Sequence, residues 1–178
     1  MCADVTGMSG AGITLISGDI RRGSLATTND VSELIEELQY TLGEGPCIDA
    51  YHDNRPVFEP DLVAPAVPRW LAFSGPAIDA GVRAIFGFPL QAGTSRLGAL
   101  DLYCDQAGSL TDEQYDDALI LADLTAETSA DGCIWREDDK LQNLDCDEMK
   151  KTATAKSIHQ RTNITTAILL YHLWVIMG

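Results

Sequence analysis

Lysine is absent from the first 130 residues of this 178-residue chain. Those residues carry 20 acidic side chains against 6 arginines, a formal charge near −14, whereas residues 131–178 carry 7 acidic side chains, 4 lysines and 2 arginines. So acidic a surface argues against DNA and anionic membranes as partners of the first part, because both are negatively charged themselves. The change in composition predicts a body at 1–130 and a separate tail at 131–178.

Common catalytic and metal-binding motifs are also missing. The sequence has no CxxC, HxxxH or HExxH motif, no GxSxG elbow and no glycine-rich phosphate loop with its lysine. Such motifs set thiols, imidazoles, nucleophiles or backbone N–H groups at the spacing that metals, phosphates and acyl transfer require. We therefore predict that the protein is not an enzyme and has no metal site, and the residues name no cofactor.

Neither a disulfide framework nor a membrane span is predicted. The five cysteines are an odd number at wide spacings, unlike the framework of a small secreted domain. The N-terminus has no basic and apolar pattern of a secretory signal. The longest apolar run, 164–177, is about 14 residues long and contains His172, which is short for a bilayer span. A reduced, cytoplasmic protein is the simplest interpretation.

The patterns that are present predict an α+β body. Two apolar runs joined by a short glycine-containing connection indicate an antiparallel hairpin at 82–90 and 96–104. Capping boxes are expected at Asp30–Glu33 and at Thr111–Gln114, each at the start of a helix. The remaining expected elements are strands at 12–17, 20–28 and 57–58 and helices at 30–42, 46–52 and 70–80.

Several short motifs, in order over about residues 5–128, resemble a GAF domain of the type joined to an ANTAR RNA-binding module in bacterial regulators. They are GAGITL (10–15), LGEGPCIDA (42–50), RPV (55–57), PRW (68–70), AGVRAIFGFPL (80–90), LGALDLY (97–103) and GSLT (108–111). The resemblance implies a central antiparallel sheet of five or six strands flanked by helices, with helices on one face and a ligand pocket on the other. It also implies a helix before the first strand, for which residues 1–10 leave room only in part.

The tail, 131–178, is expected to be helical and to be a partial or degenerate ANTAR-like module. LQNL (141–144), AKSI (155–158) and RTNIT (161–165) resemble parts of that module, although Ser157 replaces an expected glycine. Its basic residues would contact RNA. The alternatives are a solvated charged helix and sequence of unrelated origin. The predicted RNA-binding residues are Lys150, Lys151, Lys156 and Arg161.

Cys47 is the most informative single residue of the body. It follows Pro46 in the first turn of a helix, where the helix dipole favours a thiolate, whereas Glu44 and Asp49 disfavour one. A sensing thiol and a small buried side chain are both compatible with this position. Nearby aromatic residues either line an apolar ligand pocket or form ordinary core. The predicted ligand-binding residues are Cys47, Tyr51, Trp70, Phe73, Phe86 and Phe88.

Asp101 alternates with Leu100 and Leu102, so it faces the other side of its strand. We interpret it as solvated or hydrogen-bonded at the sheet face, and an Arg83–Asp101 pair across the hairpin is compatible with the spacing.

Three functions are consistent with these patterns. The first is a cytoplasmic sensory domain that binds a small molecule or senses redox state and acts through helices at a homodimer interface. The second is a GAF–ANTAR regulator that binds RNA and controls transcription antitermination. The third is a GAF-fold free methionine sulfoxide reductase, which requires pocket thiols to converge, and Cys47 and Cys104 are the candidates.

Overall fold

The computed structural model describes residues 3, 6–17 and 20–130 of the chain. The predicted RNA-binding residues and the rest of the tail, 131–178, lie outside these described residues. The described elements, in chain order, are β1 (Gly10–Ser17), β2 (Ile20–Thr27), α2 (Asp30–Leu42), α3 (Pro46–Asp53), β3 (Val57–Glu59), α4 (Leu71–Asp79), β4 (Ala84–Ala92), β5 (Ser95–Cys104) and α5 (Asp112–Ala130). Strands and helices therefore follow one another along the chain in the order that the sequence predicts.

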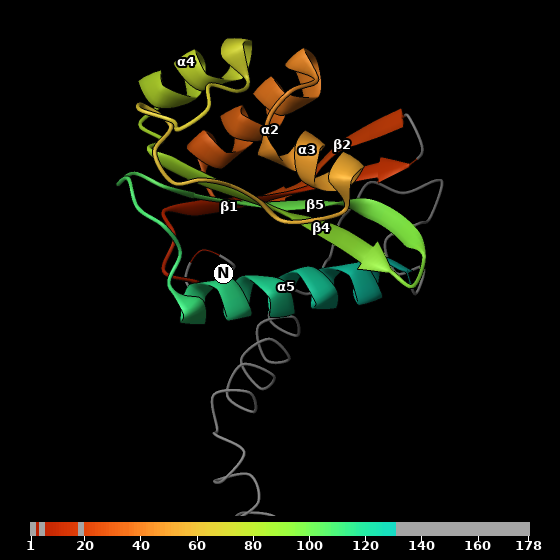
Figure 1. Ribbon diagram of the computed structural model, residues 1–178. Helices are drawn as coiled ribbons and strands as arrows, with labels where there is room; N and C mark the ends of the chain where they lie inside the picture. Colours follow the sequence, from red (N-terminus) through yellow and green to blue (C-terminus); the bar gives the residue numbers. More distant parts are fainter. Residues whose placement is uncertain (1–2, 4–5, 18–19, 131–178) are drawn as a thin grey trace, which may run out of the picture. The chain divides into compact units, whose positions relative to one another are not determined.

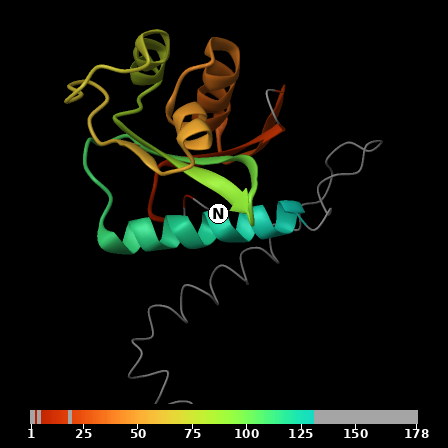
Figure 2. The same ribbon diagram turned by 45° about the vertical axis from the view of Figure 1, so that its right-hand side comes forward.

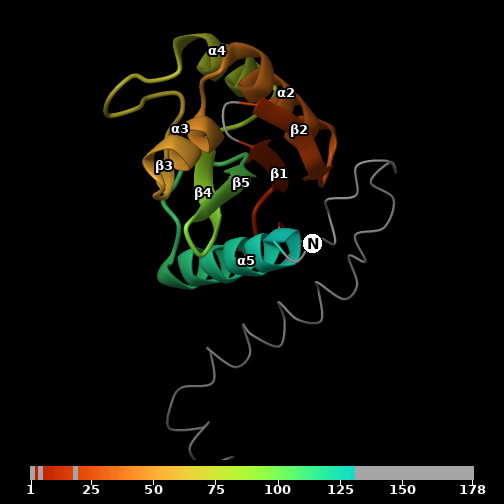
Figure 3. The ribbon, with the colours of Figure 1, turned by 90° about the vertical axis from the view of Figure 1, so that its right-hand side faces the viewer.

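The five strands form one antiparallel sheet in the order β2-β1-β5-β4-β3. This confirms the predicted α+β class. Helices α2, α3 and α4 lie over one face of the sheet, and α5 runs along the other (Figures 1 and 2). Viewed from the side, the sheet separates α5 from the other helices (Figure 3). Among the described helices, none has the length and apolar character needed to cross a membrane.

The helix ends follow from side-chain and glycine caps. The Asn29 side chain accepts a hydrogen bond from the Ser32 backbone N–H at 2.9 Å, so Asn29 caps α2. The predicted cap at Asp30 is therefore wrong by one residue. Gly43 ends the helix with φ of 71°, a left-handed conformation that glycine adopts without steric cost. The second predicted capping box is confirmed, because Thr111 and Gln114 exchange side-chain and backbone hydrogen bonds at 3.0 and 3.2 Å.

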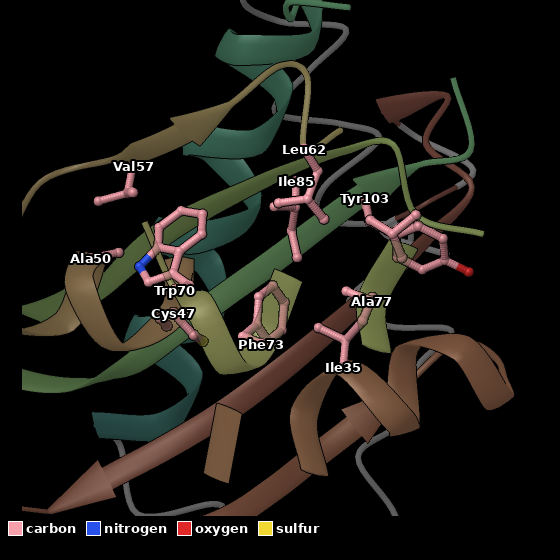
Figure 4. Close-up of a cluster of buried hydrophobic side chains, with 12 residues drawn as sticks. Ile35, Cys47, Ala50, Val57, Leu62, Trp70, Phe73, Ala77, Ile85 and Tyr103 are labelled. Carbon is pink, nitrogen blue, oxygen red and sulfur yellow. The ribbon is translucent and has the colours of Figure 1, made fainter. Parts of the chain in front are cut away.

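Two separate groups of buried side chains pack on the two faces of the sheet. We call the group beneath α2, α3 and α4 the helix-side cluster, and most of its members are drawn in Figure 4. The group facing α5 includes the buried Phe86 and Phe88, which form an aromatic cluster with the half-buried Tyr115 and with Phe58, which is 40% exposed. The helix-side cluster consists of Ile35, Cys47, Ala50, Val57, Leu62, Trp70, Phe73, Ala77, Val82, Ile85, Ala99 and Tyr103.

Candidate functional site

Asp101 lies in β5 between two glycines of the neighbouring strands. Its cross-strand partners are Gly12 in β1 and Gly87 in β4. A Cβ atom on Gly12 would collide with the Glu36 carboxylate, and one on Gly87 would lie 2.5 Å from the Pro46 carbonyl oxygen. Glycine in a strand often marks such a close approach by another segment. The two glycines thus allow α2 and the start of α3 to reach the sheet on either side of Asp101.

Polar side chains meet in the space that these glycines leave open. Glu36 of α2, Cys47 of α3 and Asp101 of β5 are each at most 3% exposed. The Cys47 sulfur and one oxygen from each carboxylate all lie within 4.8 Å of one another. We call these three residues the acid–thiol cluster. A group this polar is unusual inside a domain, because burying unpaired charge is costly.

Two neighbouring side chains hold the acid–thiol cluster in place. Thr14 of β1 donates a hydrogen bond through Oγ1 to Glu36 Oε2. Gln39 of α2 donates through Nε2 to Asp101 Oδ2 and accepts at Oε1 from the Cys47 backbone N–H at 2.8 Å. The second carboxylate oxygens, Glu36 Oε1 and Asp101 Oδ1, are buried and have no hydrogen-bond partner among the described residues.

Burial changes the acidity of all three groups. Removal from water raises the pKa of Asp101 to about 6, although hydrogen bonds, first that from Gln39, favour its charged form. Removal from water and the charge of Asp101 raise the pKa of Glu36 well above its usual range. Burial, followed by the charges of Asp101 and Glu36, raises the pKa of the Cys47 thiol. The thiol form of Cys47 is favoured, contrary to what the helix dipole alone suggests.

Glu44 and Asp49, which we expected to act on Cys47, have other partners. Glu44 Oε1 accepts hydrogen bonds from the backbone N–H groups of Ala72 and Phe73, at 2.5 and 3.0 Å, at the start of α4. Asp49 Oδ2 accepts one from the Trp70 indole Nε1–H at 2.9 Å. Trp70 has the left-handed φ of 53°, which is uncommon for a bulky residue. These contacts fix Trp70 and α4 against α3.

The structure brings together three of the six predicted ligand-binding residues. Cys47, Trp70 and Phe73 all belong to the helix-side cluster (Figure 4). Tyr51 follows one turn later on α3 and is also buried. Ligand binding by these residues stays a prediction.

Phe86 and Phe88 are not part of that group. They alternate with Ile85 along β4 and pack with Phe58 and Tyr115 on the α5 face, with ring centroids 5.7 to 6.1 Å apart. The expectation that they share one pocket with Cys47 therefore does not match the structure, because strand neighbours point to opposite faces.

Two further pairings considered from the sequence do not form. Arg83 donates to the backbone carbonyls of Ile78 and Val82, at 2.9 and 2.8 Å, rather than to Asp101. Cys104 Sγ lies 3.3 Å from Met8 Sδ. Because Cys104 is three residues after Asp101 on β5, it faces the opposite side of the sheet from Cys47 and the two thiols do not converge.

The sequence patterns did not reveal Glu36 and Gln39. Leu34, Leu38 and Leu42 recur at helical spacing in α2, which favours a buried leucine stripe. The buried residues of α2 are instead Ser32, Ile35, Glu36 and Gln39, while Leu34 and Leu42 are exposed. These buried residues still recur at helical spacing, but three of them are polar, so a search for apolar residues at that spacing does not find them. The glycines opposite Asp101 are the one trace of this contact in the sequence.

Comparison with known proteins places the chain in a family. A family model described as GAF domain matches residues 2–128. No curated protein matches the chain significantly.

Solved structures with a similar fold cover most of the chain. A domain of a protein described as a two-component sensor histidine kinase, from Sinorhizobium meliloti 1021, is 16% identical, with a TM-score of 0.56 over 72% of this chain and 83% of that one. The type II free methionine-R-sulfoxide reductase of Thermoplasma acidophilum is 19% identical, with a TM-score of 0.53 over 70% and 80%. The GAF domain of an Acinetobacter phosphoenolpyruvate-protein phosphotransferase is 13% identical, with a TM-score of 0.54 over 78% and 81%. At these identities the likeness concerns the fold.

Proposed function

Since this chain belongs to the GAF domain family, we propose that it is a cytoplasmic sensory signalling domain that responds to a small molecule bound between α3, α4 and the sheet. The occurrence of the same fold in a sensor histidine kinase protein and in a phosphotransferase supports a signalling role. The tail would carry or reach the output.

The acid–thiol cluster is the observation that carries this proposal. A domain that serves only as a scaffold gains little from burying Glu36 and Asp101 together, because desolvation and their mutual repulsion both oppose it. Buried groups with raised pKa values are concentrated at functional sites. Cys47 of this cluster packs in the same buried group as Trp70 and Phe73. Asp49 holds the Trp70 side chain, and Glu44 holds the Phe73 backbone.

Small-molecule binding fits these contacts better than redox sensing does. A sensing thiol reacts as the thiolate and needs access to the oxidant. Cys47 is 1% exposed, and burial raises its pKa. A ligand that separates Trp70 from Asp49 would instead move α4 relative to α3.

Output through helices at a homodimer interface is part of the same proposal. The exposed apolar side chains on α2 and α4 offer a surface for such a contact, and Leu71 is 85% exposed. The others are Leu34, Tyr40 and Leu42.

The test is a thermal-shift screen of a metabolite library against the full chain. Hits are then measured on Phe73→Leu and on the matched control Phe88→Leu, since both phenylalanines are fully buried but on opposite faces of the sheet. We expect at least a tenfold loss of affinity in Phe73→Leu and none in Phe88→Leu. An equal loss in both variants, or no hit at all, would count against the proposal.

A further inference from the structure

Two buried carboxylate oxygens point to a second kind of ligand, at the same acid–thiol cluster on which the small-molecule proposal rests. Glu36 Oε1 and Asp101 Oδ1 are buried without a donor that lies permanently in place, and one oxygen of each carboxylate lies within 4.8 Å of the Cys47 sulfur. Protons on Glu36 and Cys47 can be shared with Asp101, so the cluster holds either these protons or a cation. The three residues come from α2, α3 and β5, so tertiary packing alone brings them together. Buried carboxylate oxygens nearly always have a partner, which makes these two an exception that requires an explanation.

No protein cation is available to compensate the two acids among the residues whose side chains the structure describes. The sequence places no lysine between residues 1 and 130. Each arginine with a described side chain is bound elsewhere. These arginines are Arg55 with Asp53, Arg69 with Glu59 and Phe58, Arg83 with Ile78 and Val82, and Arg96 with Tyr51 and His52. Within this part of the chain, a proton or a bound cation is left to compensate the two acids.

The hydrogen bonds around the cluster resemble those that orient metal ligands. Each carboxylate has one oxygen held by a donor, Thr14 for Glu36 and Gln39 for Asp101, while its other oxygen is buried without such a donor. The same Gln39 side chain fixes the backbone of Cys47 and thereby the position of its sulfur. Outer hydrogen bonds of this kind set the orientation of first-sphere carboxylates in metal sites.

We propose that Glu36, Cys47 and Asp101 bind one divalent transition-metal ion of the zinc class. Two carboxylate oxygens and a thiolate form a mixed ligand set that suits zinc better than calcium or magnesium, which take oxygen ligands only. Three protein ligands leave a further coordination position for water or an exogenous molecule.

Exchange of two protons for one divalent ion leaves the charge of the cluster unchanged. With Cys47 as the thiol and one proton on the two acids, the cluster carries a charge of −1. Binding of the ion releases the thiol proton and the acid proton, so two protons leave as two positive charges enter. The buried region keeps the same net charge, and both free oxygens gain a partner.

The test uses Co²⁺ as a spectroscopic probe on the full chain after dialysis against a chelator. We expect one equivalent to bind with a sulfur-to-cobalt charge-transfer band in the near ultraviolet, and Zn²⁺ to displace it. A variant in which Cys2, Cys104, Cys133 and Cys146 are all serine should keep the band, because Cys47 is then the only thiol. Glu36→Gln and Asp101→Asn, which keep the side-chain shapes, should each weaken binding at least tenfold.

Some outcomes would overturn the metal site. They are the absence of a charge-transfer band in the variant that keeps only Cys47, and a band that survives Cys47→Ser in the full chain. If Cys47→Ser does not fold by circular dichroism, the variant that keeps only Cys47 decides alone. The metal site would also be overturned if the protein took up no metal and infrared spectroscopy showed a proton shared by the two carboxyl groups. A proton would then compensate the acids. The small-molecule screen is read separately, so either proposal can fail without the other.

Discussion

Gln39 donates a hydrogen bond from α2 to the Asp101 carboxylate at the centre of the sheet, and the same amide accepts the Cys47 backbone N–H at the start of α3. One side chain thereby links two helices to the strand that carries the buried acid. The position of Cys47 relative to Asp101 depends on this amide.

Replacing Gln39 with methionine keeps its approximate size but removes both hydrogen bonds. The buried carboxylate and the Cys47 N–H lose a partner, so we expect a loss of about 2–4 kcal/mol in the free energy of unfolding, measured with urea. Gln91→Met is the matched control, because Gln91 is exposed and bonds Asn54 at the surface, and we expect a change below about 0.5 kcal/mol there. Similar values for the two variants would contradict a structural role for Gln39.

The close approach of α2 to β1 predicts strong intolerance of a side chain at Gly12. Gly12→Ala forces a methyl group against the Glu36 carboxylate, and we expect at least about 2 kcal/mol of destabilisation. Gly75 in α4 has open space around its Cβ position and an ordinary backbone conformation. Gly75→Ala should therefore change stability by less than about 1 kcal/mol, because the helix preference of alanine opposes its crowding against the ring of Pro76. Thermal unfolding of both variants tests the pair, and equal effects would refute the packing argument.

Stability of the metal-free protein should fall as the pH rises from about 4 to above 6. The folded pKa of Asp101 is about 6 and its ordinary value is 3.8, so the folded state binds the proton more tightly than the unfolded chain. The stabilisation from protonated Asp101 is fully present below about pH 4 and is lost as the pH rises through 6. The free energy of unfolding should fall by on the order of 2–3 kcal/mol over this range. Glu36, which faces Asp101, acts in the same direction, and the Cys47 thiol remains neutral over this range.

Urea unfolding at pH 4, 5, 6 and 7 measures this dependence. Asp101→Asn should reduce it, whereas Asp105→Asn, at an exposed position after the end of β5, should leave it unchanged. A profile that rises over this range in the native chain and is unaltered in Asp101→Asn would rule out the raised pKa.

The Trp70–Asp49 hydrogen bond should control the local environment of Trp70. In a background with Trp135 and Trp174 replaced by phenylalanine, Trp70 alone reports by fluorescence. Asp49→Ala leaves the buried indole N–H without this acceptor, so we expect a red-shifted emission and a loss of about 1–2 kcal/mol. Asp53→Ala breaks only an exposed ion pair with Arg55 and should change neither quantity measurably. An unchanged emission in Asp49→Ala would mean that this bond does not hold the ring.

Local signals along the chain were sufficient to predict the strands and helices of this protein. Alternating apolar runs around a glycine-containing turn predicted β4 and β5, and Gly43, Pro46 and Thr111 marked helix ends, because these signals depend on neighbouring residues alone. The same local patterns predicted the order of the strands and helices along the chain. The same local logic misplaced the cap of α2 by one residue, since Asn29 and Asp30 are both good caps.

Which side of each strand or helix is buried, and which element covers it, depends on long-range packing. Phe86 and Phe88 share a face of β4 by alternation, but α5 rather than α3 covers that face. Glu36, Cys47 and Asp101 are far apart in the sequence and meet because the strand register sets Asp101 between two glycines. Polar residues buried by such packing leave no hydrophobic period, since the cost of burying them is offset by contacts that exist only in the folded chain.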